Sequence, residues 1–389
     1  MINSVITMNK TTANTPPRVK LKSSPGPRRV TFGPADTSLA TRWWVLLLAL
    51  AAVIALAGVS LFVGASPLSL SDLLDGNQSA QEVFWISRVP RTVAALLAGA
   101  AVAISGLIMQ QLARNRFVEP NMVGSTESAM LGILAVTIFV PSMPVIGKMG
   151  VATIFSLVGT ALFLAIINNL PTRATLLIPL VGIMLGGIIS AAATFVAYRN
   201  DLLQTLNAWM IGDLSGIIQG RYELLWIVAV VGLVGYIAAD RFTAAGLGSD
   251  FCTSIGMNYR VTVRLGMAVV ALISAVTVTT VGALPFLGLV VPNLVSVLVG
   301  DHLRRAVPWT ALIGAGMVLA CDIAGRLIRM PYEVPVGMIM SVLGSIVFLS
   351  MIIHQRYQNV PPSSKKRARQ AAKKAAAMRK SAAQEAARG

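Results

Sequence analysis

The feature that most limits how this chain can fold is a series of apolar runs, each about 20 residues long. Wound as an α-helix, a run of that length crosses the roughly 30 Å of hydrocarbon in a lipid bilayer. The sequence therefore predicts an all-α polytopic membrane protein, a bundle of about ten transmembrane helices. The segments run about 43–64, 90–113, 121–140, 150–169, 175–197, 221–240, 261–281, 286–300, 308–328 and 334–353.

The composition supports a single membrane domain rather than several soluble ones. Of the 389 residues, 55% are hydrophobic and only 12% are charged, whereas about a quarter of the residues in a soluble domain are charged. Two stretches depart from the simple span. Segment 286–300 is short and interrupted by Pro285 and Pro292, which predicts a half-membrane element shielded inside the bundle. The stretch 201–216 is amphipathic, which predicts a helix on the membrane surface.

The chain divides into three parts by charge. Residues 1–41 form a leader rich in Pro, Thr, Ser and Lys that we expect to be disordered. Residues 42–354 form the transmembrane domain, and 355–389 form a basic tail. Nearly all of the net charge of +17 lies in the two tails, and the C-terminal basic run at 365–369 lacks the stacking aromatics of a nucleic-acid site. We therefore predict no nucleic-acid partner and interpret this C-terminal run as a cytoplasmic anchor near anionic lipid headgroups.

The positive charges also predict an orientation. With the N-terminus inside, 25 of the 32 Lys and Arg residues fall on the inner side and seven on the outer side. Without the tails the split is eight to seven, so the short loops contribute little. Ten crossings place both basic tails on one side, and we expect both termini to be cytoplasmic, with the protein spanning a cell membrane.

Residues that could carry chemistry are scarce. The sequence contains no G-x-x-x-x-G-K-[ST] loop, no H-E-x-x-H helix and no G-x-S-x-G turn. His302 and His354 lie far apart, and Cys252 and Cys321 form no ligand pattern and suit single free thiols. We therefore predict no catalytic, cofactor or metal site and no enzymatic activity of the chain itself.

Carboxylates within the predicted spans bear on the source of energy, because an ion-coupled transporter usually needs one near the middle of the membrane. Asp322 lies four residues before Arg326, a spacing that predicts a structural ion pair along one helix. Glu127 lies near the beginning of its helix, where the helix dipole favours an anion. These positions indicate that another subunit supplies the energy. A proton-coupled secondary transporter and a membrane receptor or structural protein stay open as alternatives.

Four stretches, in a fixed order across about residues 43–354, carry a family resemblance. They are SRVPRTVAALLAGAA (87–101), SGLIMQQLARNRFVEPNMVG (105–124), GALPFLGLVVPNLVSVLVGDHLRR (282–305) and DIAGRLIRMPYEVPVG (322–337). Together they resemble the FecCD family, the type II importer permeases for ferric siderophores, haem and cobalamin.

The resemblance implies a ten-helix permease that dimerises with a second copy or a paralogue around a central pathway. It also implies two ATPase subunits on the cytoplasmic side and an extracytoplasmic substrate-binding protein outside. We expect the cargo to be a ferric siderophore, with haem or cobalamin as the alternative. The permease needs no cofactor of its own, because the ATPase subunits hydrolyse ATP.

At the outer face, the resemblance implies that Arg88, Arg91 and Arg326 receive glutamates of the binding protein. Arginine suits this role because its planar guanidinium presents a fork of donors to a carboxylate. The alternative interpretation is that these side chains only extend from helix ends toward water. Asp322 can hold Arg326 in place under either interpretation.

At the inner face, the resemblance implies that loop 241–260 is the coupling element that presses into the ATPase. The residues expected to make this contact are Gly246, Gly248, Ser254, Ile255, Gly256, Asn258 and Arg260. Thr175 lies where the family narrows its cytoplasmic gate, although the following Leu176 departs from the expected small polar residue. Gly182 and Gly186 predict close packing of one helix on another.

Two departures from the common family pattern bear on the substrate. Asn293 stands where many relatives have His after the proline of the eighth segment, and Arg114–Val118 (RNRFV) replaces the commoner Arg-Asn-Pro-Leu-Ala. The second departure resembles a subgroup that serves catecholate or mixed-ligand siderophores through paired, non-identical permeases. The sequence does not distinguish a homodimer from a heterodimer, and it does not name the siderophore.

Overall fold

The computed structural model describes residues 43–64, 71, 73, 75–168 and 177–358. Within these ranges the protein is helical, and the only extended pairing is an isolated bridge between Ile211 and Ala283. The predicted all-α class is therefore confirmed. The predictions for the leader, for Thr175 and for most of the C-terminal tail lie outside the described residues.

A helix occupies most of each of the ten predicted apolar segments. These helices are α2 (Trp43–Phe62), α5 (Val89–Ala113), α6 (Ser125–Phe139), α7 (Val145–Asn168), α8 (Leu177–Arg199), α10 (Leu225–Ile237), α13 (Tyr259–Val281), α14 (Leu287–Val299), α15 (Leu303–Ile328) and α16 (Val336–Gln358). Seven of the described helical stretches are long and apolar enough to cross a bilayer. An eighth arises if α10 is joined to α11 (Ala239–Leu247) across a bend of 58°. The helices α6 and α14 are shorter.

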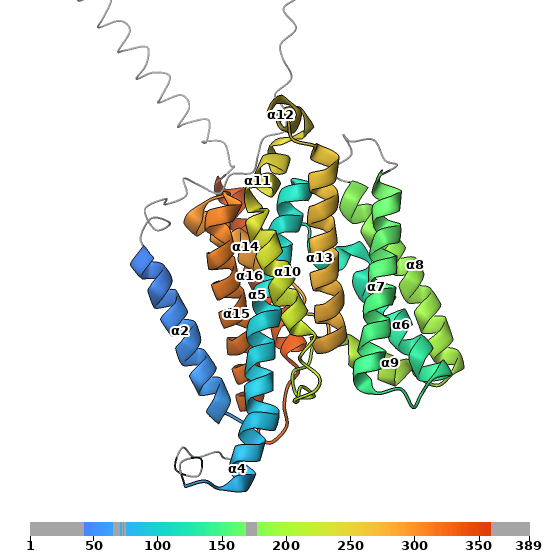
Figure 1. The fold of residues 1–389 in the computed structure, drawn as a ribbon, viewed down its shortest axis with the longest axis vertical. Helices are drawn as coiled ribbons and strands as arrows, with labels where there is room; N and C mark the ends of the chain where they lie inside the picture. The colour runs from blue at the N-terminus through green and yellow to red at the C-terminus, as the bar shows by residue number, and fades with distance from the viewer. Residues whose placement is uncertain (1–42, 65–70, 72, 74, 169–176, 359–389) are drawn as a thin grey trace, which may run out of the picture.

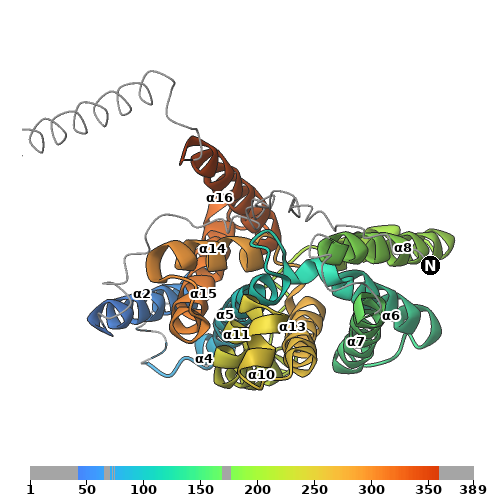
Figure 2. The same ribbon diagram turned by 90° about the horizontal axis from the view of Figure 1, so that it is seen from above.

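Helix α5 is the centre of the bundle. It continues α4 (Gln78–Val83) through the π-helical turn η1 (Phe84–Arg88), and it packs against α15, α13, α14 and α10 (Figure 2). Glycines allow two of these contacts to become backbone contacts. A Cβ atom on Gly99 would lie 2.6 Å from the Gly314 carbonyl oxygen on α15, and one on Gly106 would overlap Gly288 on α14. Small residues permit such close approach between membrane helices, where dispersion contacts provide much of the stabilisation.

Helices α6, α7 and α8 form a second group, which joins the central one mainly through α13 (Figure 2). Gly182 of α8 packs so closely on the short 3₁₀ helix η2 (Pro120–Val123) that a Cβ atom there would overlap the Met122 carbonyl. A Cβ atom on Gly186 would lie 3.3 Å from the Glu127 carboxylate of α6. The predicted close packing at these two glycines is confirmed.

Two shorter elements were predicted with different success. Helix α14 is a 13-residue helix with Pro292 inside it, and residues Leu287–Asn293 are all buried. The prediction of a short, shielded element at 286–300 is therefore confirmed. The surface helix predicted over 201–216 is shorter, since α9 covers only Leu203–Met210 and the chain after it is irregular.

The bundle has two distinct ends (Figure 1). Helices α4 and α9 lie toward one of them, called the α4 end. Helix α11 and the short α12 (Ser249–Ser254) lie toward the opposite one, called the α12 end.

Candidate functional site

Three arginines and two carboxylates form a cluster at the α4 end. The arginine cluster consists of Arg88, Arg91, Asp322, Arg326 and Glu333. Its members come from η1, the beginning of α5, the last two turns of α15 and the segment before α16. The three arginine side chains expected at the outer surface are buried, with exposed fractions of 6%, 8% and 2% for Arg88, Arg91 and Arg326. A buried guanidinium needs partners, because an unpaired charge in an apolar environment is costly.

Asp322 supplies most of that pairing. Its Oδ1 atom accepts hydrogen bonds from Nη2 of Arg91 at 2.7 Å and from Nε of Arg91 at 3.2 Å. Its Oδ2 atom accepts from Nη2 of Arg326, one helical turn later on α15. One carboxylate therefore joins α5 to α15 and holds both guanidinium groups in fixed positions.

The other donors of the cluster hold the end of α2. Arg326 Nη1 donates to the carbonyl oxygens of Ser60 at 2.8 Å and Val63 at 2.6 Å, and Arg88 Nη1 donates to the same Val63 oxygen at 2.6 Å. Gly64 lies directly against the Arg88 guanidinium, so that a Cβ atom there would overlap it. These side chains replace the hydrogen bonds that the last carbonyls of a helix lack.

Glu333 is the accessible member of the cluster. Its Oε2 atom accepts from Arg91 Nη1 at 2.7 Å, and its side chain is 24% exposed. Neighbours of the cluster in sequence are exposed and apolar: Trp85, Ile86, Leu327, Ile328, Met330 and Tyr332. With three arginines and two carboxylates, the cluster has one positive charge in excess. The excess positive charge lies on buried guanidinium groups, and Glu333 is the most accessible charged group of the cluster.

At the α12 end, two of the predicted coupling residues face inward. Gly246 packs on Gln111 of α5 so closely that a Cβ atom would overlap that side chain. Gly248 is buried at a φ of 129°, with the Arg114 guanidinium 3.1 Å from where a Cβ atom would be. A side chain at Gly248 would therefore be strained as well as crowded. These two glycines attach the turn between α11 and α12 to the end of α5.

The other predicted coupling residues, namely Ser254, Ile255, Gly256, Asn258 and Arg260, are exposed. Asn258 caps α13 by accepting a hydrogen bond from the Val261 amide at 3.2 Å. The sequence reasoning missed Leu247 and Phe251, which are 43% and 42% exposed and precede Ile255 at intervals of four residues. That spacing was visible in the sequence, but Gly248 interrupts it and obscures a common apolar face.

The two residues that depart from the family pattern have structural partners. Asn293 is buried and donates from Nδ2 to the carbonyl oxygens of Arg116 at 2.9 Å and Leu289 at 2.8 Å. The Arg116 guanidinium in turn donates to Ser296 Oγ at 2.8 Å and to Asp301 at 2.7 Å. The bonds of Arg116 attach the chain after α5 to the middle of α14, to its last turn and to the segment that follows it.

Cys252 and Cys321 are buried free thiols. Burial raises the pKa of the Cys252 thiol, whose sulfur lies 3.5 Å from the Ala244 carbonyl oxygen. Across the described parts of the chain, no group of three or more His, Cys, Asp or Glu residues is placed to hold a metal ion.

Comparison with known proteins gives a consistent result. A sequence profile of the FecCD transport family matches residues 48–354. The petrobactin import system permease protein YclN of Bacillus subtilis is 43% identical over 305 residues, which cover 78% of this chain and 96% of that protein. The petrobactin import system permease protein FatD of Bacillus anthracis is 40% identical, covering 80% of this chain and 91% of its own length. The ferric-anguibactin transport system permease protein FatD of Vibrio anguillarum is also 40% identical, covering 77% and 95%.

A solved structure shares the fold. It is an inward-facing structure assigned to the metal-chelate type of ABC transporter, and it matches with a TM-score of 0.72. The match covers 80% of this chain and 99% of the other chain at 22% sequence identity. The two chains therefore share the same arrangement of helices.

Proposed function

The chain belongs to the FecCD transport family, and we propose that it is the permease subunit of an ABC importer for ferric siderophores. One observation carries the proposal: permeases for petrobactin and ferric anguibactin match at 40–43% identity over more than nine tenths of their own lengths. The apolar helices are those of a multi-pass protein of the cell membrane. With no P-loop in the sequence, ATP would be hydrolysed by separate ATPase subunits.

The proposed topology has ten membrane segments with both termini in the cytoplasm. Seven long helices, the bent pair α10–α11 and the two short helices α6 and α14 supply the ten segments. The short α14 is compatible with this topology because its backbone is enclosed by other helices rather than by lipid. In this topology the α4 end faces outside and the α12 end faces the cytoplasm.

The α12 end is the proposed site of ATPase binding. The exposed side chains of Leu247, Phe251 and Ile255 supply an apolar contact surface, while Gly246 and Gly248 attach that surface rigidly to α5. Because α5 is the central helix of the bundle, a displacement of this turn acts directly on the core of the permease.

The α4 end is the proposed site of the substrate-binding protein, with Arg88, Arg91 and Arg326 as the cationic centre. Since these arginines already bind Asp322, Glu333 and the end of α2, an incoming carboxylate has to share or replace one of these partners. Glu333 is the partner most open to replacement because it is the most exposed member of the cluster.

A second permease chain, identical or paralogous, is the proposed partner across the pathway. Helices α8 and α16 project from the bundle (Figure 2) and expose large apolar side chains, among them Ile183, Ile188, Val342 and Ile346. Thr175, the proposed gate residue, lies outside the described residues.

The proposal is tested by uptake of ⁵⁵Fe-loaded petrobactin into cells that lack their own siderophore permeases. The chain is expressed with its ATPase and binding protein. We expect uptake that vanadate blocks and that persists when an uncoupler collapses the proton gradient. Unlabelled ferric petrobactin should compete with this uptake, whereas haem and cobalamin should not. Uptake that collapses with the uncoupler and ignores vanadate would instead show a proton-coupled transporter.

A further inference from the structure

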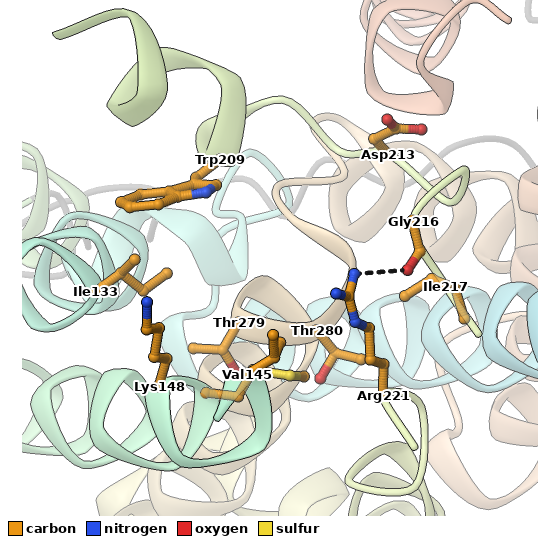
Figure 3. Close-up of a pocket in the computed structure, with 11 residues that line it drawn as sticks. Ile133, Val145, Lys148, Trp209, Asp213, Gly216, Ile217, Arg221, Thr279 and Thr280 are labelled. Carbon is orange, nitrogen blue, oxygen red and sulfur yellow. Dashed lines mark hydrogen bonds between the residues drawn. The ribbon is translucent and has the colours of Figure 1, made fainter. Parts of the chain in front are cut away.

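A cavity of about 360 Å³ lies at the α4 end, apart from the arginine cluster (Figure 3). Its walls come from α6, from the beginning of α7, from the last turn of α9 and the chain after it, and from the last turn of α13. Aliphatic side chains line part of it, and Lys148, Trp209, Arg221, Thr279 and Thr280 supply its polar and aromatic groups.

The two cations of the cavity are poorly paired. Lys148 and Arg221 rise from opposite sides of the cavity, and Trp209 faces them (Figure 3). Arg221 donates one hydrogen bond, from Nη1 to the Gly216 carbonyl oxygen at 3.2 Å. Lys148 is half-buried, and its ammonium has no hydrogen-bond or ion-pair partner among the described residues. Partly buried cations with unused donors favour an anionic ligand.

One carboxylate also lines the cavity, and it is already engaged. Asp213 accepts hydrogen bonds from the Ser215 amide at 2.9 Å and from the Ser215 hydroxyl at 2.6 Å. It lies beyond Gly216 and away from Lys148 (Figure 3). The lining therefore keeps an excess of one positive charge, contributed by Lys148 and Arg221 from opposite sides of the cavity.

The remaining surface fits the organic part of such a ligand. The half-buried indole of Trp209 presents a large apolar ring, and Thr279 and Thr280 turn their hydroxyls back to carbonyls of their own helix. A cavity of this size accommodates one arm of a larger molecule rather than all of it. The ligand thus combines anionic oxygens with an apolar or aromatic arm.

We propose that this cavity is an outer binding site for the anionic arm of the iron chelate, occupied before the chelate enters the translocation pathway. The inference rests on the proposed function and on the α4 end facing outside. Ferric iron is a hard cation, so that its chelators bind it through anionic oxygens, and unneutralised oxygens leave the complex with negative charge. Lys148 and Arg221 bind those oxygens, and Trp209 packs against the arm that carries them.

The experiment uses the full-length chain in nanodiscs of phosphatidylcholine, with ⁵⁵Fe-loaded petrobactin as the probe in equilibrium binding. We expect saturable binding that weakens at least tenfold in the double variant Lys148→Gln/Arg221→Gln. The variant Lys148→Arg should keep most of the affinity because it keeps the charge. The matched control is Arg199→Gln, which removes an exposed cation at the end of α8 that does not line the cavity. Unchanged thermal unfolding midpoints show that the variants are folded.

Three results would overturn the inference. The first is that the wild-type chain does not bind the probe, and the second is that the wild-type chain and the double variant bind it equally. The third is that phosphatidylglycerol added to the nanodiscs lowers the affinity of the wild-type chain but not that of the double variant, because a lipid headgroup then occupies the site. The uptake assay in cells tests the proposed function independently of this binding assay. Vanadate-sensitive uptake without binding at the cavity would reject this site and leave the permease assignment intact.

Discussion

The two ends of the bundle differ in how the residues of their candidate sites are packed. At the α4 end, Arg88, Arg91 and Arg326 are buried and bound to carboxylates and carbonyls of the same chain. At the α12 end, Phe251 and Ile255 are exposed and contact nothing that their removal would unpair. One end is therefore stabilised by the residues of its candidate site, whereas at the other end the fold does not depend on the exposed side chains of the candidate site. Substitutions at the two ends should therefore fail in different ways.

The largest expected effect is at Asp322. Asp322→Ala removes the carboxylate shared by two buried guanidinium groups, and breaking a buried pair typically costs about 3–5 kcal/mol. We expect the purified variant to show a much lower thermal unfolding midpoint and a low yield in membranes. Arg329→Ala is the control, because Arg329 is exposed at the same end and its guanidinium carbon lies over the Tyr332 ring, 5.8 Å from the ring centroid. A wild-type midpoint for Asp322→Ala would show that the arginine cluster does not stabilise the fold.

The next effect is at the α12 end, where folding should be unaffected and assembly should be lost. Phe251→Asp with Ile255→Asp removes two exposed apolar side chains, each worth roughly 1.5–3 kcal/mol when buried. Since about 1.4 kcal/mol is a factor of ten in affinity, ATPase association should fall at least a hundredfold. Co-purification and stimulated ATP hydrolysis measure this loss.

The matched control for that pair is Thr253→Asp. Thr253 is exposed on the same short helix but lies two residues from each of the others, on the opposite side. Full ATPase association by the Phe251/Ile255 variant, or an equal loss in Thr253→Asp, would reject this apolar face as the contact.

A smaller effect is expected at Glu333, which pairs with Arg91 and lies at the proposed docking site of the binding protein. Glu333→Gln keeps a hydrogen-bond acceptor for Arg91 but removes a charge that is 24% exposed, so stability should fall by only about 1 kcal/mol. The excess positive charge of the cluster rises, and an acidic binding protein should dock several-fold more tightly at low salt. Affinity measured at several salt concentrations tests this. Weaker docking would mean that Glu333 holds Arg91 in the orientation that the binding protein needs, and does not compete with a carboxylate of the binding protein for Arg91.

The smallest effect on function is expected at Gly256. Its φ of 72° favours glycine, but nothing lies within 4 Å of where a Cβ atom would be. Gly256→Ala should therefore cost only about 1–2 kcal/mol of backbone strain, with transport retained. At Gly248 the same change meets both a φ of 129° and the Arg114 guanidinium, and it should impair coupling more strongly. Uptake assays should therefore give a higher transport rate for Gly256→Ala than for Gly248→Ala.

The contrast also explains how far the sequence could predict the site. The apolar runs predict the ten helices, and the prolines predict that α14 is short. The spacing of Asp322 and Arg326 along one helix predicts their pairing. Arg91 and Asp322 are 231 residues apart, and only the packing of α5 on α15 brings them together. The burial of the arginines could not be predicted for the same reason, since it depends on where the end of α2 lies.

The orientation of the two ends underlies every assignment above, and cysteine accessibility measures it directly. Tyr332→Cys and Ile255→Cys each place a thiol at a position that is 70% or 55% exposed, at the α4 end and the α12 end respectively. The native Cys252 and Cys321 are buried and should contribute little background. In intact cells, a membrane-impermeant maleimide should label Tyr332→Cys and should reach Ile255→Cys only after the membrane is opened. Labelling of Ile255→Cys in intact cells, with Tyr332→Cys protected, would place the ATPase contact on the wrong side and contradict the account.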